Sequence, residues 1–278
     1  MILAAISFGA LTYQPFFDSN NPISSNDYHP DEGVWIAVGK ESFQRYFIER
    51  DWSYESWEDG RFGDFGTHNP TIGKYIIGAA LFLSGAADEA TVFPGYEFSN
   101  GLIWDEVKDI QPPPEALQAA RAAMRWLAVL STICIYFLGK SLTQSRSTGL
   151  VVGILFTLKP LVITSGRRAM MEMPLLFFSL LSLLLGFHLL EAIRLGRHRW
   201  VLGYAIGFGI ILGLVISTKL SAVLVLVTVV LWSGSNLVRK YSMDSLGEEG
   251  PGLNSWSKSL WVTLLALALA IGLALLIF

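Results

Sequence analysis

The sequence contains a single cysteine, Cys134, which lies inside an apolar run. An internal disulfide and a cysteine-based zinc site are therefore excluded. Charged residues are also scarce, at 15% of the 278 residues. No basic stripe on a polar face is visible, and a nucleic-acid-binding function is excluded on that ground.

The few charges are unevenly distributed along the chain. Between Tyr13 and Arg121 there are eighteen acidic and seven basic residues, whereas the rest of the chain has five acidic and thirteen basic residues. Hydrophobic residues make up 52% of the sequence, and the mean hydropathy of +0.47 is higher than a soluble domain of this length would have. This pattern indicates an integral membrane protein with one acidic segment outside the bilayer.

Long apolar runs predict the membrane spans, because a helix needs about 20 apolar residues to cross the hydrocarbon core. We predict an all-α, multi-pass helical bundle of about seven spans. The run 1–13 lacks the basic start of a signal peptide, and we interpret it as the outer part of a truncated first span. Because the last run also stops within a helix, we expect the chain to be part of a longer protein. The other six runs are 122–138, 149–165, 174–193, 201–217, 222–232 and 260–278.

Clusters of lysine and arginine predict the topology, because such clusters favour the cytoplasmic side. They follow the runs that begin at residues 122, 174 and 222. With these clusters inside, Arg121 and Tyr13 both lie outside, and the short run 72–87 does not cross but forms a surface or re-entrant helix. The predicted organisation is a first span (1–13), an external loop with short interfacial helices (14–121) and a transmembrane bundle (122–278), in the cell membrane.

Four short stretches on the predicted external side contain the residues that could act on a substrate. Ionisable residues at the ends of apolar helices are candidates for function because their desolvation is costly. The stretches are Asp31-Glu32, NPTIGK (69–74), RAMMEMPLLFF (168–178) and GLVISTK (213–219).

In this order, the four stretches resemble the polyprenyl-phosphate-dependent glycosyltransferases, the membrane-embedded GT-C enzymes that include protein O-mannosyltransferases and aminoarabinose transferases. The resemblance covers the N-terminal half of such an enzyme. Asn69 stands where the family has a histidine, and Thr71 where it has a second proline. The resemblance implies inverting transfer of a sugar from a dolichyl- or undecaprenyl-type phosphate donor to a hydroxyl of a protein, lipid or glycan at the external membrane face.

The resemblance also implies roles for single residues. Asp31 matches the proposed general base, which takes the proton of the acceptor hydroxyl, and Glu32 would orient a neighbour or the acceptor. The leaving lipid phosphate must be held by cations, for which arginine and lysine are suited. Whether a divalent metal takes part is left open, and no metal ligand is assigned. The candidate substrate-binding residues are Asn69, Lys74, Arg121, Arg168, Glu172 and Lys219.

Simpler interpretations exist for the same residues. Asp31-Glu32 could be a solvated turn, Arg167-Arg168 an anchor at the headgroups, and Lys219 a plain turn. A second hypothesis is a non-catalytic membrane subunit derived from such an enzyme. A transporter is less favoured, because the charges gather at one face rather than at the bilayer midplane.

Overall fold

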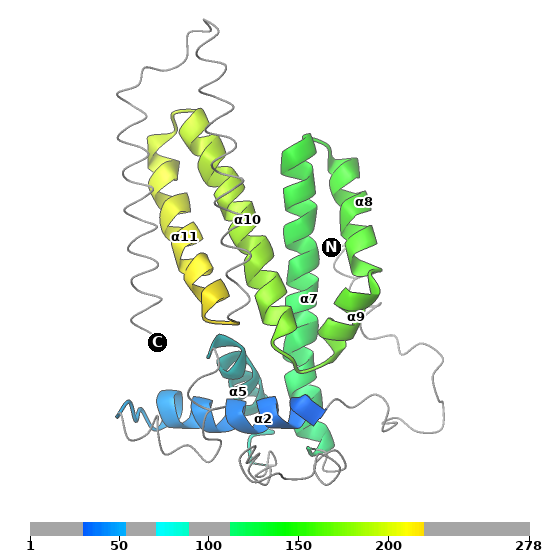
Figure 1. Cartoon of the computed structure of the whole chain (residues 1–278), viewed down its shortest axis with the longest axis vertical. Helices are drawn as coiled ribbons and strands as arrows, with labels where there is room; N and C mark the ends of the chain where they lie inside the picture. Colours follow the sequence, from blue (N-terminus) through cyan, green and yellow to red (C-terminus); the bar gives the residue numbers. More distant parts are fainter. Residues whose placement is uncertain (1–29, 54–70, 89–111, 220–278) are drawn as a thin grey trace, which may run out of the picture. The chain divides into compact units, whose positions relative to one another are not determined.

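The computed structural model describes residues 30–53, 71–88 and 112–219, and these ranges contain helices and no strand (Figure 1). The chain divides into two compact units, Met1–Phe177 and Phe178–Phe278, and each is described by itself. The predicted all-α fold is confirmed for the described residues.

Two short helices of the first unit, α2 (Pro30–Phe43) and α5 (Ile72–Ser84), pack closely against each other. Each has a glycine at the crossing. A Cβ atom on Gly39 would lie 2.9 Å from the carbonyl oxygen of Lys74 and 3.2 Å from the amide nitrogen of Gly78. Small residues are what allow two helix backbones to approach this closely. The close crossing therefore places the backbone of Lys74 directly against α2.

A longer helix, α7 (Pro114–Thr143), follows, and α8 (Arg146–Thr157) returns alongside it. The Ser145 hydroxyl caps α8 by accepting a hydrogen bond from a backbone N–H of its first turn. Helix α8 ends before Pro160, because proline has no N–H to continue the ladder. Helix α9 (Pro160–Arg167) then leaves at an angle of 62° to α8.

Helices α2, α5 and α7 and the segment after α9 share one hydrophobic core. Its buried members include Ile36 from α2, Ile77 from α5, Met124 from α7 and Ala169 from the segment after α9. Helix α2 lies across the N-terminal end of α7 (Figure 1). This core brings together parts of the chain that are far apart in the sequence.

Helix α10 (Glu172–Arg194) begins in the first unit and continues into the second, where it packs against α11 (His198–Ile216) through Leu189 and Phe208. Gly196 ends α10 in the left-handed region, with a φ of 65°. The turn between the helices is closed by a hydrogen bond from Arg197 N to Ala192 O at 3.0 Å.

Among the described helices, α7, α10 and α11 are long and apolar enough to cross a membrane, and the bent pair α8–α9 adds a fourth if it forms one span. They correspond to four of the predicted runs. The runs 1–13, 222–232 and 260–278 lie outside the described residues, so the total of seven spans stays a prediction, as does the external loop. Helix α5 has 13 residues and is too short to cross.

Two local expectations differ from the structure. Helix α7 begins at Pro114, upstream of the predicted span, so Arg121 lies within a helix and not at the end of a loop. Asp31 and Glu32, for which a solvated turn was an alternative interpretation, lie in the first turn of α2. In both places a proline begins the helix, and its fixed φ favours the first helical position. Acidic residues in the first turn add to this preference.

Candidate functional site

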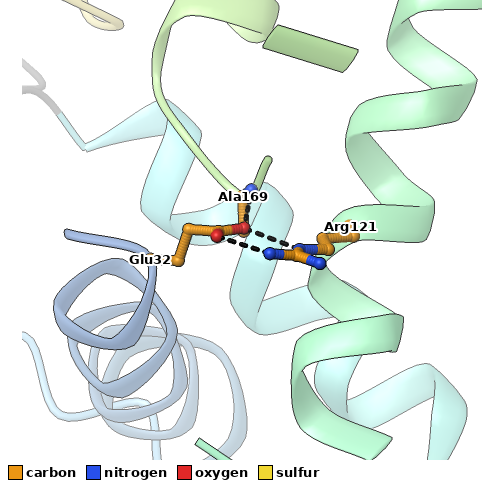
Figure 2. A network of polar contacts seen from close by, with 3 residues as sticks. All are labelled: Glu32, Arg121 and Ala169. Carbon is orange, nitrogen blue, oxygen red and sulfur yellow. Dashed lines mark hydrogen bonds and ion pairs between the residues drawn. The ribbon is translucent and has the colours of Figure 1, made fainter. Parts of the chain in front are cut away.

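The Glu32 carboxylate joins three segments of the first unit (Figure 2). The Arg121 guanidinium donates two parallel hydrogen bonds to it, from Nε to Oε1 at 2.8 Å and from Nη2 to Oε2 at 2.7 Å. The backbone N–H of Ala169 donates a third to Oε1, also at 2.8 Å. Helix α2, helix α7 and the segment after α9 therefore meet at one carboxylate.

This network lies inside the protein. The Glu32 side chain is 0% exposed and the Arg121 side chain is 18% exposed. A buried charge is tolerated only when it is paired and hydrogen-bonded, and two parallel bonds to a guanidinium are the strongest such pairing. Because Glu32 has no exposed surface, an acceptor cannot reach it. What the structure shows for Glu32 is a structural link between the segments that it joins.

The backbone after α9 explains how Ala169 becomes a donor. Helix α9 ends at Arg167, and Arg168 has an extended backbone, with φ −109° and ψ 143°. The N–H of Ala169 therefore has no place in a helical ladder, and a buried N–H must find another acceptor. Glu32 provides that acceptor.

Asp31 precedes Glu32 in the first turn of α2 and is only partly buried. Successive residues of an α-helix point in directions about 100° apart. With Glu32 facing the core, Asp31 faces away from it. Of the two predicted catalytic carboxylates, Asp31 is therefore the one that has exposed surface.

Lys74 lies in the first turn of α5 and is completely buried. Burial lowers its pKa from the ordinary value of 10.5 to about 8. The neighbouring Gly73 packs against the side chain of Met171, which occupies the space that a Cβ on Gly73 would need. The segment that binds Glu32 through Ala169 thus also supports the turn of α5 that contains Lys74.

The other predicted residues are not all in this network. Arg168 and Glu172 are partly buried in the first unit, on either side of the turn between α9 and α10. They do not share one helix. Lys219 is partly buried and belongs to the second unit. Asn69 lies outside the described residues.

A family model for dolichyl-phosphate-mannose-protein mannosyltransferase matches residues 63–248, which is more than half of the chain. The chain belongs to this family. No curated protein matches it. The resemblance found in the four sequence stretches is confirmed, and membership implies a polyprenyl-phosphate-dependent glycosyltransferase activity in a membrane.

The match to the mannosyltransferase family begins after α2, so Asp31 and Glu32 lie outside it. The structure nevertheless connects them to it, because both partners of Glu32, Arg121 and Ala169, lie within the matched residues. These hydrogen bonds therefore hold helix α2 against the residues that match the family model.

One residue near the network was missed in the sequence. Arg125 lies one helical turn after Arg121 on α7, is half-buried, and interacts electrostatically with both Arg121 and Arg167. The signal was present, because residues four apart share one face of a helix. Arg125 falls inside an apolar run, so the hydropathy pattern alone does not single it out.

Proposed function

We propose that this mannosyltransferase-family chain transfers a sugar from a polyprenyl-phosphate donor to a hydroxyl of an acceptor protein at the external membrane face, with inversion at the anomeric carbon. Asp31 is the general base in this proposal. The main support is the buried Glu32 network, which attaches the helix that carries Asp31 to the matched residues through Arg121 and Ala169.

The reaction is a single displacement. Asp31 accepts the proton of the acceptor hydroxyl as its oxygen forms a bond to the anomeric carbon. The bond from that carbon to the phosphate oxygen breaks, and the polyprenyl phosphate leaves with the electron pair. Attack from the face opposite the leaving group inverts the configuration. The products are a glycosylated acceptor and a polyprenyl phosphate.

The remaining polar residues bind the donor and hold Asp31 in place. Glu32 and Arg121 act as positioning residues, because each is occupied by the other. Arg168 supplies positive charge to the phosphate, which is worth most where charge develops in the transition state. Lys74 is completely buried, so it adds to the positive potential without touching the phosphate. Asn69, Glu172 and Lys219 remain proposed contacts to the substrates.

The test is a sugar-transfer assay on the full chain in lipid nanodiscs, with dolichyl-phosphate mannose and a serine- and threonine-containing peptide. Asp31→Asn keeps the shape of the side chain and removes the base, so the rate should fall by roughly 100-fold or more. Donor affinity should change little. Glu49→Gln is the matched control, because Glu49 is an exposed acid near the end of the same helical segment.

The result separates the competing interpretations. An unchanged rate for Asp31→Asn would remove Asp31 from the mechanism. Absence of transfer by the wild-type chain, together with stoichiometric co-purification of another membrane protein, would favour the non-catalytic subunit instead.

A further inference from the structure

Residues 194–200, the arginine turn between α10 and α11, contain three exposed arginines and no acidic residue. Arg194 ends α10, Arg197 precedes α11, and Arg199 lies in the first turn of α11. In the described part of the chain, the side chains of these arginines form no hydrogen bond or ion pair with another residue. Glu191 is the nearest acidic residue in the sequence, and its carboxylate lies 3.4 Å from the ring of His188. The positive charge of the arginine turn is therefore not neutralised by the residues described around it.

The face of α11 that begins at Arg199 is exposed and apolar. Leu202, Ile206 and Ile210 follow Arg199 by three, seven and eleven residues, which is the spacing of one helix face. All three side chains are half-exposed. At a rise of about 1.5 Å per residue, this face extends about 16 Å along the helix. That length is close to half of the hydrocarbon core, which is about 30 Å thick, so the face matches the depth of one leaflet.

Aromatic rings lie beside the arginine turn. The ring of Trp200 is exposed, and its centroid lies 6.1 Å from that of Tyr204, one turn further along α11. Tyr204 stacks in turn on His188 of α10, with the ring centroids 5.6 Å apart. Tryptophan and tyrosine are enriched where the headgroups meet the acyl chains. The rings therefore indicate that the arginine turn lies at the level of the headgroups.

The two parts of this surface, the arginine turn and the apolar face of α11, together define the chemistry of a ligand. A soluble anion would contact the arginines but would leave the apolar face uncovered. A zwitterionic phospholipid would cover the apolar face, but its own cation would lie near three like charges. An anionic phospholipid satisfies both parts, because its phosphate accepts two parallel hydrogen bonds from a guanidinium and its acyl chains cover apolar side chains.

We propose that the arginine turn and the apolar face of α11 form a binding site for an anionic phospholipid. Arg194, Arg197 and Arg199 contact the headgroup, and the acyl chains lie along Leu202, Ile206 and Ile210. The predicted topology puts this turn on the cytoplasmic side, where the leaflet carries anionic lipids. The site belongs to the second unit and does not depend on the proposed sugar transfer.

The experiment compares phosphatidylglycerol with phosphatidylcholine that has the same acyl chains. Titration of the full chain in detergent micelles gives an apparent Kd for each lipid, and the wild type should bind phosphatidylglycerol more tightly. Arg194→Gln, Arg197→Gln and Arg199→Gln should each weaken phosphatidylglycerol binding about fivefold, the usual effect of one cation near an anionic lipid. Binding of phosphatidylcholine should change less.

Arg50→Gln is the matched control, because Arg50 is exposed but stands between Glu49 and Asp51. It should bind both lipids like the wild type. An equal loss for Arg50→Gln would show that only the net charge matters and would overturn the site. Wild-type binding of phosphatidylglycerol by all three variants of the arginine turn would overturn it as well. If these variants fail to fold, the wild type is titrated at high salt, where phosphatidylglycerol binding should weaken and an unchanged Kd would contradict the proposal.

Two further measurements test the apolar face. The triple change Leu202→Ala, Ile206→Ala and Ile210→Ala keeps good helix formers but removes contacts with the acyl chains, so it should weaken both lipids by similar factors. Glycerol phosphate has the charge of the headgroup without the chains, and an equal concentration of it should not displace phosphatidylglycerol. Displacement by glycerol phosphate would assign the arginine turn to soluble anions, and unchanged lipid binding by the triple variant would remove the apolar face from the site. Either result would overturn the proposal.

Discussion

Arg121 and Glu32, which are 89 residues apart in the sequence, form a bidentate ion pair between two helices, with hydrogen bonds of 2.8 and 2.7 Å. The pair holds the helix that carries Asp31 against α7. The first prediction follows from its burial.

Breaking this pair on one side should strongly destabilise the protein. Glu32→Gln leaves the Arg121 charge without its carboxylate, which costs about 3–5 kcal/mol for a buried pair. The double variant Glu32→Gln with Arg121→Met removes both charges and should unfold at a higher temperature than Glu32→Gln alone. Thermal unfolding in detergent measures both effects.

Glu41→Gln is the control for this prediction. Glu41 pairs with Arg45 at 3.1 Å where both side chains are partly exposed, and such a pair contributes about 0–1 kcal/mol. Equal losses from Glu41→Gln and Glu32→Gln would contradict the prediction.

The crossing of α2 and α5 should not tolerate a methyl group. A Cβ on Gly78 would collide with the carbonyl oxygen of Gly39 and the Cβ of Phe43. Gly78→Ala should therefore lower the stability by about 1–3 kcal/mol, the usual cost of overpacking. Gly203→Ala should have the opposite sign, because Gly203 lies within α11 with open space around it, and alanine is the better helix former by about 1 kcal/mol. A neutral Gly78→Ala would show that the two helices can separate freely.

Lys74 should make stability depend on pH above neutrality. Burial lowers its pKa to about 8, so between pH 8 and 10.5 the unfolded chain holds this proton more tightly than the folded one. The stability of the wild type therefore rises with pH across this window. At pH 7, Lys74→Met should therefore unfold at a higher temperature than the wild type. Its free energy of unfolding should be larger by up to roughly 3 kcal/mol. The gain should shrink as the pH approaches 10. Lys40→Met, at a partly exposed lysine of α2, is the control for removing a lysine charge from the same unit.

The predicted topology can be tested by chemical labelling. In a Cys134→Ser background, a cysteine at the exposed Ser84 should react with a membrane-impermeant maleimide from outside. A cysteine at Ser147, exposed in the first turn of α8, should react only after permeabilisation. Thr91, which lies outside the described residues, should behave like Ser84. If cysteines at positions 84 and 91 react only from the cytoplasmic side, the predicted orientation of every later helix is reversed.

The sequence was sufficient to predict the helical class and the apolar helices at four of the predicted runs, because each of those signals is local. Long apolar runs directly predict helices such as α10 and α11. A proline inside such a run indicates a bend, and Pro160 lies at the bend between α8 and α9. The start of α7 was misplaced because its first two turns are polar enough to fall outside an apolar run.

The geometry of the site could not be predicted in the same way. Glu32 and Arg121 were both singled out, but their pairing joins distant segments and leaves no periodic pattern. The third donor was invisible, because every residue except proline has a backbone N–H, and only the extended conformation at Arg168 turns that of Ala169 toward the carboxylate. Arg125 could have been found from the sequence, because it follows Arg121 by four residues and therefore lies on the same face of the helix.

The distances along the chain within the Glu32 network also bear on how the protein is made. The carboxylate is synthesised 89 residues before Arg121 and 137 residues before Ala169. During synthesis from the N-terminus, the Glu32 carboxylate therefore has no partner in this network until α7 has been made, and a lone carboxylate is not stable in an apolar setting. The network is complete only after the turn beyond α9 has emerged, because its third donor is the N–H of Ala169. The helix that is made first among those described thus obtains the last of these hydrogen bonds late in synthesis.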